Sequence, residues 1–308
     1  MRRSSKDVPP MGETPRTSTT CGGKSFSPWR MPGVWAFSRY SERRQRRCGF
    51  SLDFLRDWNV EKTEREEEAN EEREEEMDGQ VYIPEGHYLY RVEHRIMEGD
   101  CEYDHGPRMA RVPALFVDRY PVTNERFYRF LQESGYQPDD MKNFLRHWEN
   151  GKYREEDRHK PVVWVSHKDA EAFAGWYGAR LLTDCEWQYA AGGKEKYRYP
   201  WGDKYDRNKC NDTGEETLTP VDAYPEGASP FGLCDMCGNA HEWTEEVFDD
   251  GIHQFVLLRG GASYKGAHFW HAEGGAKPNN WHLKFQLLNE GMNRCATVTF
   301  RCAKEAAE

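Results

Sequence analysis

The chain has no run of about 20 apolar residues, the length that a helix needs to cross a bilayer. Its first residues also lack the apolar core of a secretory signal. These two absences predict a protein without a membrane span, located in the cytoplasm. The opening is rich in Arg and poor in acidic residues, which is also typical of a transit peptide, and Met77 is an alternative initiator.

An excess of positive charge, which nucleic-acid surfaces need, is missing as well. The net charge is −10, and residues 79–308 carry 28 basic against 37 acidic residues. Residues 1–59 are basic and residues 60–78 acidic, and neither stretch has an apolar period. We therefore predict a disordered N-terminal tail over residues 1–79 and one domain over residues 80–308, with no nucleic-acid partner for the domain.

Cysteine is present, but its placement excludes a simple disulfide framework. The count of nine is odd, so at least one thiol is unpaired or bridges two chains, and we expect reduced thiols. Cys234 and Cys237 have the C-x-x-C spacing of redox and zinc sites. No second pair accompanies them, so two small packed residues are the favoured interpretation.

Helix caps and apolar spacing predict three short helices. Thr123 is an N-cap with Gly135 as the stop, and Ser166 with Asp169 and Thr183 with Glu186 are capping boxes. Branched and aromatic residues predict strands at 221–224, 255–259 and 297–301, of which 255–259 is apolar on both faces and therefore central. With 27 Gly, 16 Pro and 11 Trp, the composition favours a loop-rich α+β fold.

The segment 231–244 contains two carboxylates beside a sharp turn. Asp235 and Glu242 flank Gly238 and Asn239, which bend a chain readily. Carboxylate and carbonyl oxygens are the ligands that Ca²⁺ prefers. The alternative interpretation is an ordinary turn.

Six blocks occur in a fixed order that resembles the formylglycine-generating enzyme family, also called sulfatase-modifying factors. They lie at residues 116–124, 161–166, 179–193, 199–202, 231–244 and 258–263, and Phe300-Arg-Cys302 closes the series. The resemblance implies a variant of the C-type lectin fold. It also implies a structural Ca²⁺ site made by the side chains of Asp235 and Glu242 and by the carbonyls of Gly238 and Ala240.

The chain departs from this family at the catalytic cysteines. Family members bind copper through a cysteine pair after the Arg-Gly-Gly block, whereas here no cysteine lies between Cys237 and Cys295. Soft copper requires thiolate or thioether ligands, so copper held by a cysteine pair is not expected. His268, His271 and Glu273 form an H-x-x-H-x-E set that is able to hold iron or another redox metal. Loop residues without a metal are the alternative.

Late aromatic and amide residues predict a ligand groove, and the resemblance places the substrate groove in this region. They are Trp270, Asn279, Asn280, Trp281 and His282. A peptide or a small molecule is the expected ligand. Two functions follow: a non-canonical oxidoreductase in a modification pathway, or a non-catalytic, calcium-stabilised, lectin-like binding module. A regulatory paralogue that pairs with itself or with another family member is a third.

Overall fold

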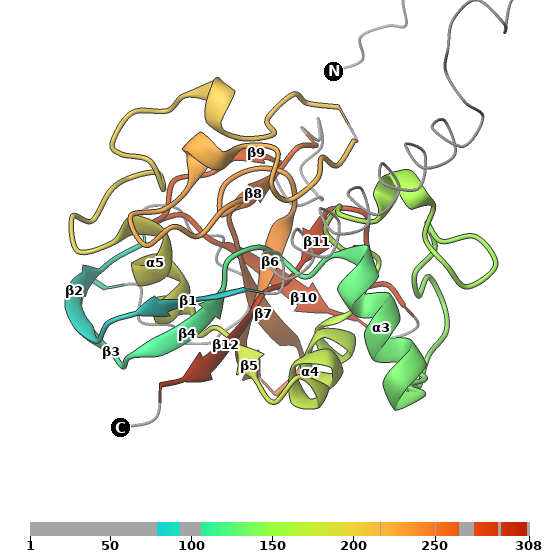
Figure 1. The fold of residues 1–308 in the computed structure, drawn as a ribbon. Helices are drawn as coiled ribbons and strands as arrows, with labels where there is room; N and C mark the ends of the chain where they lie inside the picture. Colours follow the sequence, from blue (N-terminus) through green and yellow to red (C-terminus); the bar gives the residue numbers. More distant parts are fainter. Residues whose placement is uncertain are drawn as a thin grey trace, which may run out of the picture. The chain divides into compact units, whose positions relative to one another are not determined.

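The computed structural model describes residues 79–92, 106–215, 217–249, 251–264, 274–288 and 291–306 (Figure 1). Its first four-stranded sheet is antiparallel, and its order is β1 (Gln80–Ile83), β4 (Leu115–Asp118), β12 (Cys302–Glu305) and β5 (Arg180–Leu181). Because β12 pairs with both β4 and β5, the last strand completes a sheet that the first strands begin.

The second four-stranded sheet carries the segments of greatest functional interest. Its order is β10 (Leu283–Leu287), β7 (Gln254–Arg259), β6 (His241–Asp249) and β11 (Val298–Thr299), with β11 parallel to β6. Residues 255–259 are all buried, so the predicted central strand is confirmed. Two small antiparallel pairs complete the strands: β2 (Gly86–Tyr90) with β3 (Arg108–Val112), and β8 (Gly261–Ala262) with β9 (Gly275–Ala276).

Two of the predicted strands differ from the structure. Residues 221–224 form a turn that leads into the short helix η3 (Pro225–Gly227). Pro220 and Pro225 flank this stretch and cannot donate to a sheet ladder, so its branched residues do not make a strand. Of residues 297–301, only Val298 and Thr299 pair as a strand.

The three predicted helices are confirmed together with their caps. They are α3 (Asn124–Ser134), α4 (His167–Trp176) and α5 (Asp184–Gly192). The Thr123 side chain accepts from the third amide beyond it, and both capping boxes form. Gly135 has φ 65°, the left-handed conformation that commonly ends a helix. Two single turns, η1 (Glu155–Asp157) and η2 (Arg207–Lys209), lie in the connections.

Packing stabilises these short helices, because isolated helices of about ten residues are marginal in water. Phe127 of α3 stacks on Phe173 of α4 at 5.9 Å between ring centres, and both rings contact Phe300. A second cluster joins α5 to strands β1 to β4, and α5 is buried on nearly all sides. Figure 1 shows α3 beside α4 and α5 beside β2.

Short helices, small sheets and long connections together form the predicted α+β architecture. None of the helices in the described ranges has the length and apolar character that a bilayer span requires.

Candidate ligand pocket and cation site

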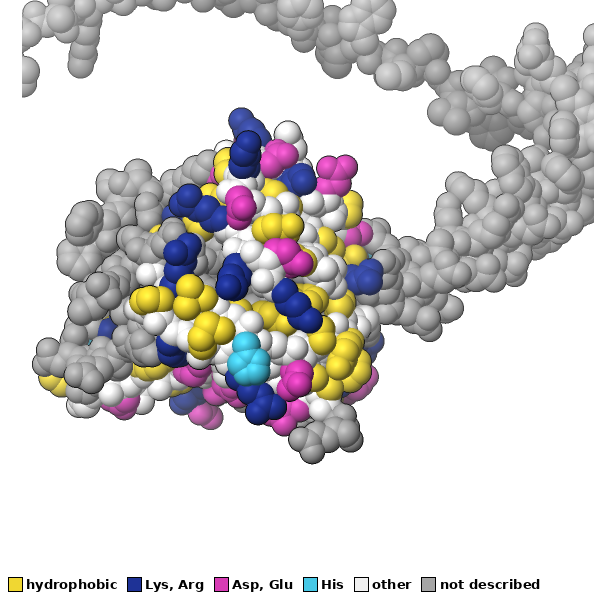
Figure 2. Space-filling view, turned by 90° about the vertical axis from the view of Figure 1, so that its left-hand side faces the viewer, with side chains coloured by type: hydrophobic (Ala, Val, Ile, Leu, Met, Phe, Trp, Pro, Cys, Tyr) yellow, Lys and Arg dark blue, Asp and Glu magenta, His cyan; other side chains and the backbone are white. Residues whose placement is uncertain are grey.

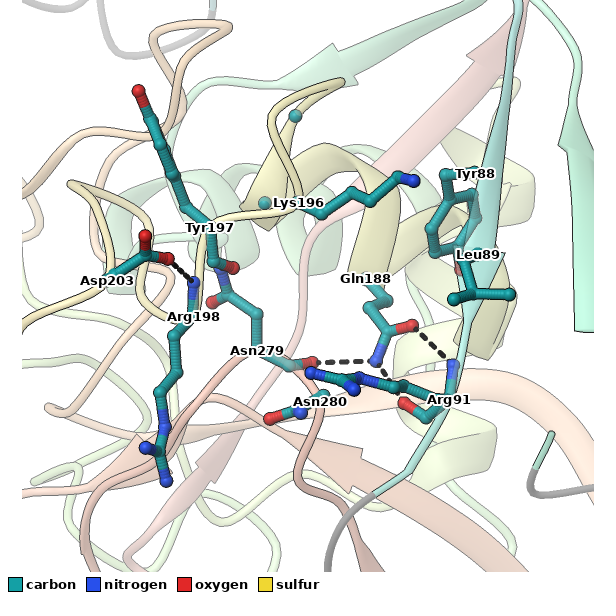
Figure 3. A pocket seen from close by; sticks show the side chains of 12 residues that line it. Tyr88, Leu89, Arg91, Gln188, Lys196, Tyr197, Arg198, Asp203, Asn279 and Asn280 are labelled. Carbon is teal, nitrogen blue, oxygen red and sulfur yellow. Dashed lines mark hydrogen bonds between the residues drawn. The ribbon is translucent and has the colours of Figure 1, made fainter. Parts of the chain in front are cut away.

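A cavity of about 510 Å³ opens between the end of β2, the end of α5 and the segment that follows β9 (Figure 3). This volume lies in the range of small-molecule sites. Asn279 and Asn280, two members of the predicted groove, line it. The full lining is Tyr88, Leu89, Arg91, Gln188, Gly192, Gly193, Lys196, Tyr197, Arg198, Asp203, Asn279 and Asn280.

Three cationic side chains and one carboxylate line the pocket, so its charge favours an anionic ligand. The cations are Arg91, Lys196 and Arg198, and the carboxylate is Asp203, whose Oδ1 accepts from the Arg198 amide at 3.2 Å. Figure 3 shows the Lys196 ammonium pointing across the cavity toward Tyr88. Figure 2 faces the side on which β2 and β3 lie in Figure 1, and Lys and Arg side chains are spread over it.

Gln188 connects the two walls of the pocket. Its Nε2 donates to the Arg91 carbonyl at 2.8 Å and to the Asn279 carbonyl at 3.2 Å, as the dashed lines of Figure 3 show. Its Oε1 accepts from the Arg91 amide at 3.4 Å. Because one side chain of α5 holds both backbone segments, the separation of the walls depends on that helix.

Two amide oxygens in the lining lack hydrogen-bond partners. Asn279 is 2% exposed, and its Nδ2 donates to the Tyr197 carbonyl at 2.9 Å, which directs its Oδ1 away from that carbonyl. Oδ1 of Asn279 and Oδ1 of Asn280 are both buried without a donor. Buried polar atoms are usually satisfied, so these two oxygens, which have almost no exposed surface, are exceptions in the lining.

The other predicted groove residues do not line the cavity. Trp281 and His282 are buried, 7% and 1% exposed. The Lys277 ammonium lies 4.4 Å from the centre of a Trp281 ring, and His282 Nδ1 lies 3.6 Å from Asp184 Oδ2. Asn279 and Asn280 occupy a turn, in which the Trp281 amide donates to the Pro278 carbonyl at 2.9 Å. Trp270 lies outside the described residues.

A buried ion pair holds the backbone segment that lines the pocket. The Arg259 guanidinium donates to both oxygens of Asp184, at 2.5 and 2.6 Å, and neither side chain is exposed. Its Nη1 donates to the carbonyls of Asn279, at 2.9 Å, and Trp281, at 3.2 Å. Burial alone would raise the pKa of Asp184, but Arg259 and His282 hold it well below its ordinary value.

The predicted cation site lies where β6 begins. Asp235 has φ 59° and Gly238 has φ 79°, so the backbone curls as the sequence predicts. Asn239 Nδ2 donates to Asp235 Oδ2 at 2.8 Å. In the described chain, no hydrogen bond reaches the buried carbonyl oxygens of Gly238 and Ala240. Two unpaired carbonyls near a buried carboxylate are suited to a hard cation.

Glu242, the second predicted side-chain ligand, is paired with an arginine. Arg301 donates to both of its carboxylate oxygens, at 2.8 and 2.7 Å, and Trp187 Nε1 donates to Oε2 at 2.8 Å. A cation bound at this turn would therefore share Glu242 with a guanidinium through the remaining lone pairs. Within the described ranges, no group of three or more His, Cys, Asp or Glu side chains is arranged to hold a metal.

The proposed redox ligands His268, His271 and Glu273 lie outside the described residues. His241, at the start of β6, is described and is fully buried. Burial and the nearby Lys277 lower its pKa to about 3, so the ring is neutral at physiological pH.

Sequence reasoning missed most of the pocket. Tyr88 lies in β2, Gln188 in α5 and Lys196 in the connection that follows, and none belongs to a motif that indicates binding. The only local signal was a Gly192-Gly193 turn followed by a basic stretch. Tertiary contacts bring these segments together.

Comparison with known proteins now assigns the class. The sulfatase-modifying factor enzyme 1-like domain family matches residues 65–306. The chain therefore belongs to this family, and its fold is the family's C-type lectin-like variant. PvdO from Pseudomonas aeruginosa has a similar fold, with a TM-score of 0.53 and 19% identity over 74% of this chain and 94% of that one.

Three relatives illustrate the range of proteins that contain such a domain. Formylglycine-generating enzyme from Thermomonospora curvata is 32% identical, over 57% of this chain and 73% of that protein. Inactive C-alpha-formylglycine-generating enzyme 2 from Mus musculus is 28% identical, over 73% and 85%. Serine/threonine-protein kinase pkn1 from Chlamydia caviae is 38% identical, over 44% and 23%. The match thus spans only about a quarter of the kinase.

Proposed function

We propose that this domain is a calcium-stabilised, ligand-binding member of the family that does not oxidise cysteine through a copper–thiolate pair. The observation that carries the binding proposal is the pocket with two buried, unpaired amide oxygens and three cations. A relative that is named inactive supports a non-catalytic role for a domain of this kind. A small anionic molecule or an acidic peptide is the ligand class that this lining favours.

The absence of one residue type supports the second half of the proposal. The chain has no cysteine between Cys237 and Cys295, the interval in which the family's copper ligands fall. Cys295 follows β10 and Cys302 begins β12, where the Cys302 side chain is fully buried in the core. The two cysteines at the end of the fold therefore do not replace the missing pair.

We predict that the protein does not convert cysteine to formylglycine. The protein would be incubated with copper, O₂ and a peptide bearing Cys-x-Pro-x-Arg, and mass spectrometry would follow the thiol and the aldehyde. The peptide should keep its thiol, because two thiolates are needed to hold soft copper in a linear site. The Thermomonospora curvata enzyme, assayed in parallel, is the positive control.

Aldehyde formation by this protein would contradict the prediction. In that event the variant His271→Ala separates two explanations. Lost turnover would assign a redox metal to His268, His271 and Glu273, whereas retained turnover would exclude that set. Iron analysis of the purified protein tests the same oxidoreductase alternative independently.

Calcium is predicted to stabilise the domain most strongly at neutral and higher pH. Burial raises the pKa of Asp235 from 3.8 to about 7, against the opposing Asn239 hydrogen bond and the Arg301 charge. The native state then binds more protons than the unfolded state between about pH 4 and 7, so stability falls as pH rises through this window. The difference corresponds to roughly 4 kcal/mol when the carboxylate is ionised. A bound cation would offset this cost by compensating the charge.

The measurement is the melting temperature with calcium and with chelator, from pH 5 to pH 8. Calcium should raise it little at pH 5 and by several degrees at pH 8, because a ligand of the native state stabilises by mass action. Asp235→Asn removes the ionisable group and should abolish the calcium effect. Burial also raises the pKa of Glu246 to about 7. Glu246 is present in both proteins, so its contribution to the pH dependence cancels in the comparison. Equal calcium effects in both proteins would refute the site.

A further inference from the structure

Two buried thiols from distant parts of the chain lie against each other. Cys210 follows η2 and Cys237 lies in the turn before β6, and each is 2% exposed. The Cys210 side chain lies near enough to Cys237 to help raise the pKa of its thiol. Both cysteines are reduced in this structure. Neighbouring thiols of this kind have a chemistry that a single buried cysteine lacks.

The backbone next to the thiols keeps them in contact. The Asn239 amide donates to the Asn211 carbonyl at 3.0 Å, and Asn211 Nδ2 donates to Asn239 Oδ1 at 3.0 Å. A Cβ at Gly238 would lie 2.6 Å from the Asn211 carbonyl oxygen and 3.3 Å from Cys210 Cβ. Glycine is therefore required at this position, and it lets the two segments approach closely.

The C-x-x-C spacing suggested a different pair. Cys234 packs in a separate small cluster with Tyr120 and Val221, and its Sγ lies 3.9 Å from the Gly232 carbonyl. The residue that contacts Cys237 is instead Cys210. The sequence motif and the spatial pair are thus different.

Cys237 also connects to the wall of the ligand pocket. Its Sγ donates to the Lys277 carbonyl at 3.4 Å. Lys277 stands two residues before Asn279, which lines the cavity together with Asn280. A change at the thiol therefore acts on the backbone that carries the two unpaired amide oxygens.

We propose that Cys210 and Cys237 are a reversible disulfide site whose closure loosens the segment 277–280. Hydrogen peroxide, a small oxidant, converts one thiol to a sulfenic acid and releases water. The second sulfur then attacks the first, an S–S bond forms and a second water leaves, so two thiols and one peroxide give one disulfide and two waters. Cys237 loses its S–H proton in this reaction and can no longer donate to Lys277. A dithiol reductant reverses the change.

The burial of the Cys237 thiol determines how fast we expect it to be oxidised. Burial raises the pKa of the Cys237 thiol well above its ordinary value, with the neighbouring Cys210 acting in the same direction. Since the thiolate is the reacting form, oxidation should be slow at neutral pH and faster as pH rises.

The test oxidises the full chain with graded hydrogen peroxide, blocks free thiols with iodoacetamide and maps the cross-linked peptides by mass spectrometry. A peptide joining Cys210 to Cys237 is expected in the wild type and in Cys234→Ser, and it should disappear after dithiothreitol. Cys210→Ser and Cys237→Ser should not form it. Cys234→Ser is the matched control because it removes a buried thiol from the same turn.

A cross-link between Cys234 and Cys237 would overturn the site. So would full alkylation of both Cys210 and Cys237 at a peroxide dose that has completely oxidised the partly exposed Cys185. Hydrogen exchange of the amides in 276–282 tests the coupling separately. Exchange should become several-fold faster in the cross-linked protein than in the reduced one. Unchanged exchange in protein shown to be cross-linked would overturn the coupling. Neither readout depends on the proposed ligand or on calcium.

Discussion

Arg301→Met is expected to lower the free energy of unfolding by about 3–5 kcal/mol, the usual cost of breaking a buried ion pair from one side. Arg301 is 1% exposed, and all of its donors are used. They contact both oxygens of Glu242 and the carbonyls of Asp118, Arg119 and Cys234, at 2.7 to 3.1 Å. Methionine fills a similar space but leaves a buried carboxylate and three carbonyls without these donors.

Chemical denaturation at pH 7 measures this loss. Arg111→Met is the matched control, because Arg111 pairs with Glu85 at 3.1 Å while both side chains are about two-thirds exposed. Exposed pairs contribute at most about 1 kcal/mol, so the control should change little. The double variant Glu242→Leu/Arg301→Met should recover part of the loss, because it leaves no unpaired charge. A loss below about 1 kcal/mol for Arg301→Met would show that the pair does not hold the fold.

Gly261→Ala is expected to cost about 2–4 kcal/mol, the sum of backbone strain and overpacking. Gly261 has φ 87°, and an added Cβ would lie 2.1 Å from the Gly275 carbonyl oxygen. The closest atom belongs to the backbone, so no movement of a side chain relieves this contact. The substitution would push β8 and β9 apart. It would also displace the chain that continues from β9 to Asn279.

Gly135→Ala separates the two causes. Gly135 has φ 65°, but no atom lies within 4 Å of an added Cβ. This variant therefore carries the conformational cost alone, about 1 kcal/mol. Thermal and chemical denaturation of the two variants should give clearly different losses. Equal losses would indicate that the contact with Gly275 relaxes without cost.

These contacts give a structural reason for the Arg-Gly-Gly block that signals the family. Arg259 binds Asp184 and holds two carbonyls of the pocket segment. Gly260 and Gly261 both have positive φ and lie against backbone atoms of Met236 and Gly275. The block thus joins the turn that contains Met236 to the segment that lines the pocket, whether or not chemistry occurs there.

Local signals in the sequence determined the helices. Thr123, Ser166 and Thr183 satisfy free amides within three residues of themselves, so their effect is visible without any tertiary contact. The strand at 255–259 was predictable because apolar residues on both faces require burial on both sides. The ordered family blocks determined the fold, since they already combine many such constraints.

Only the tertiary structure decided the sites. The partner of Glu242 is a guanidinium 59 positions away, and the thiol that meets Cys237 is Cys210 and not Cys234. The pocket joins residues of β2, α5 and the segment after β9, which have no shared spacing. Such contacts depend on how sheets and helices pack over long separations, and a hydrogen bond or ion pair depends on distances of a few tenths of an ångström. Sequence alone therefore indicates which residues are able to do chemistry, whereas packing decides which of them meet.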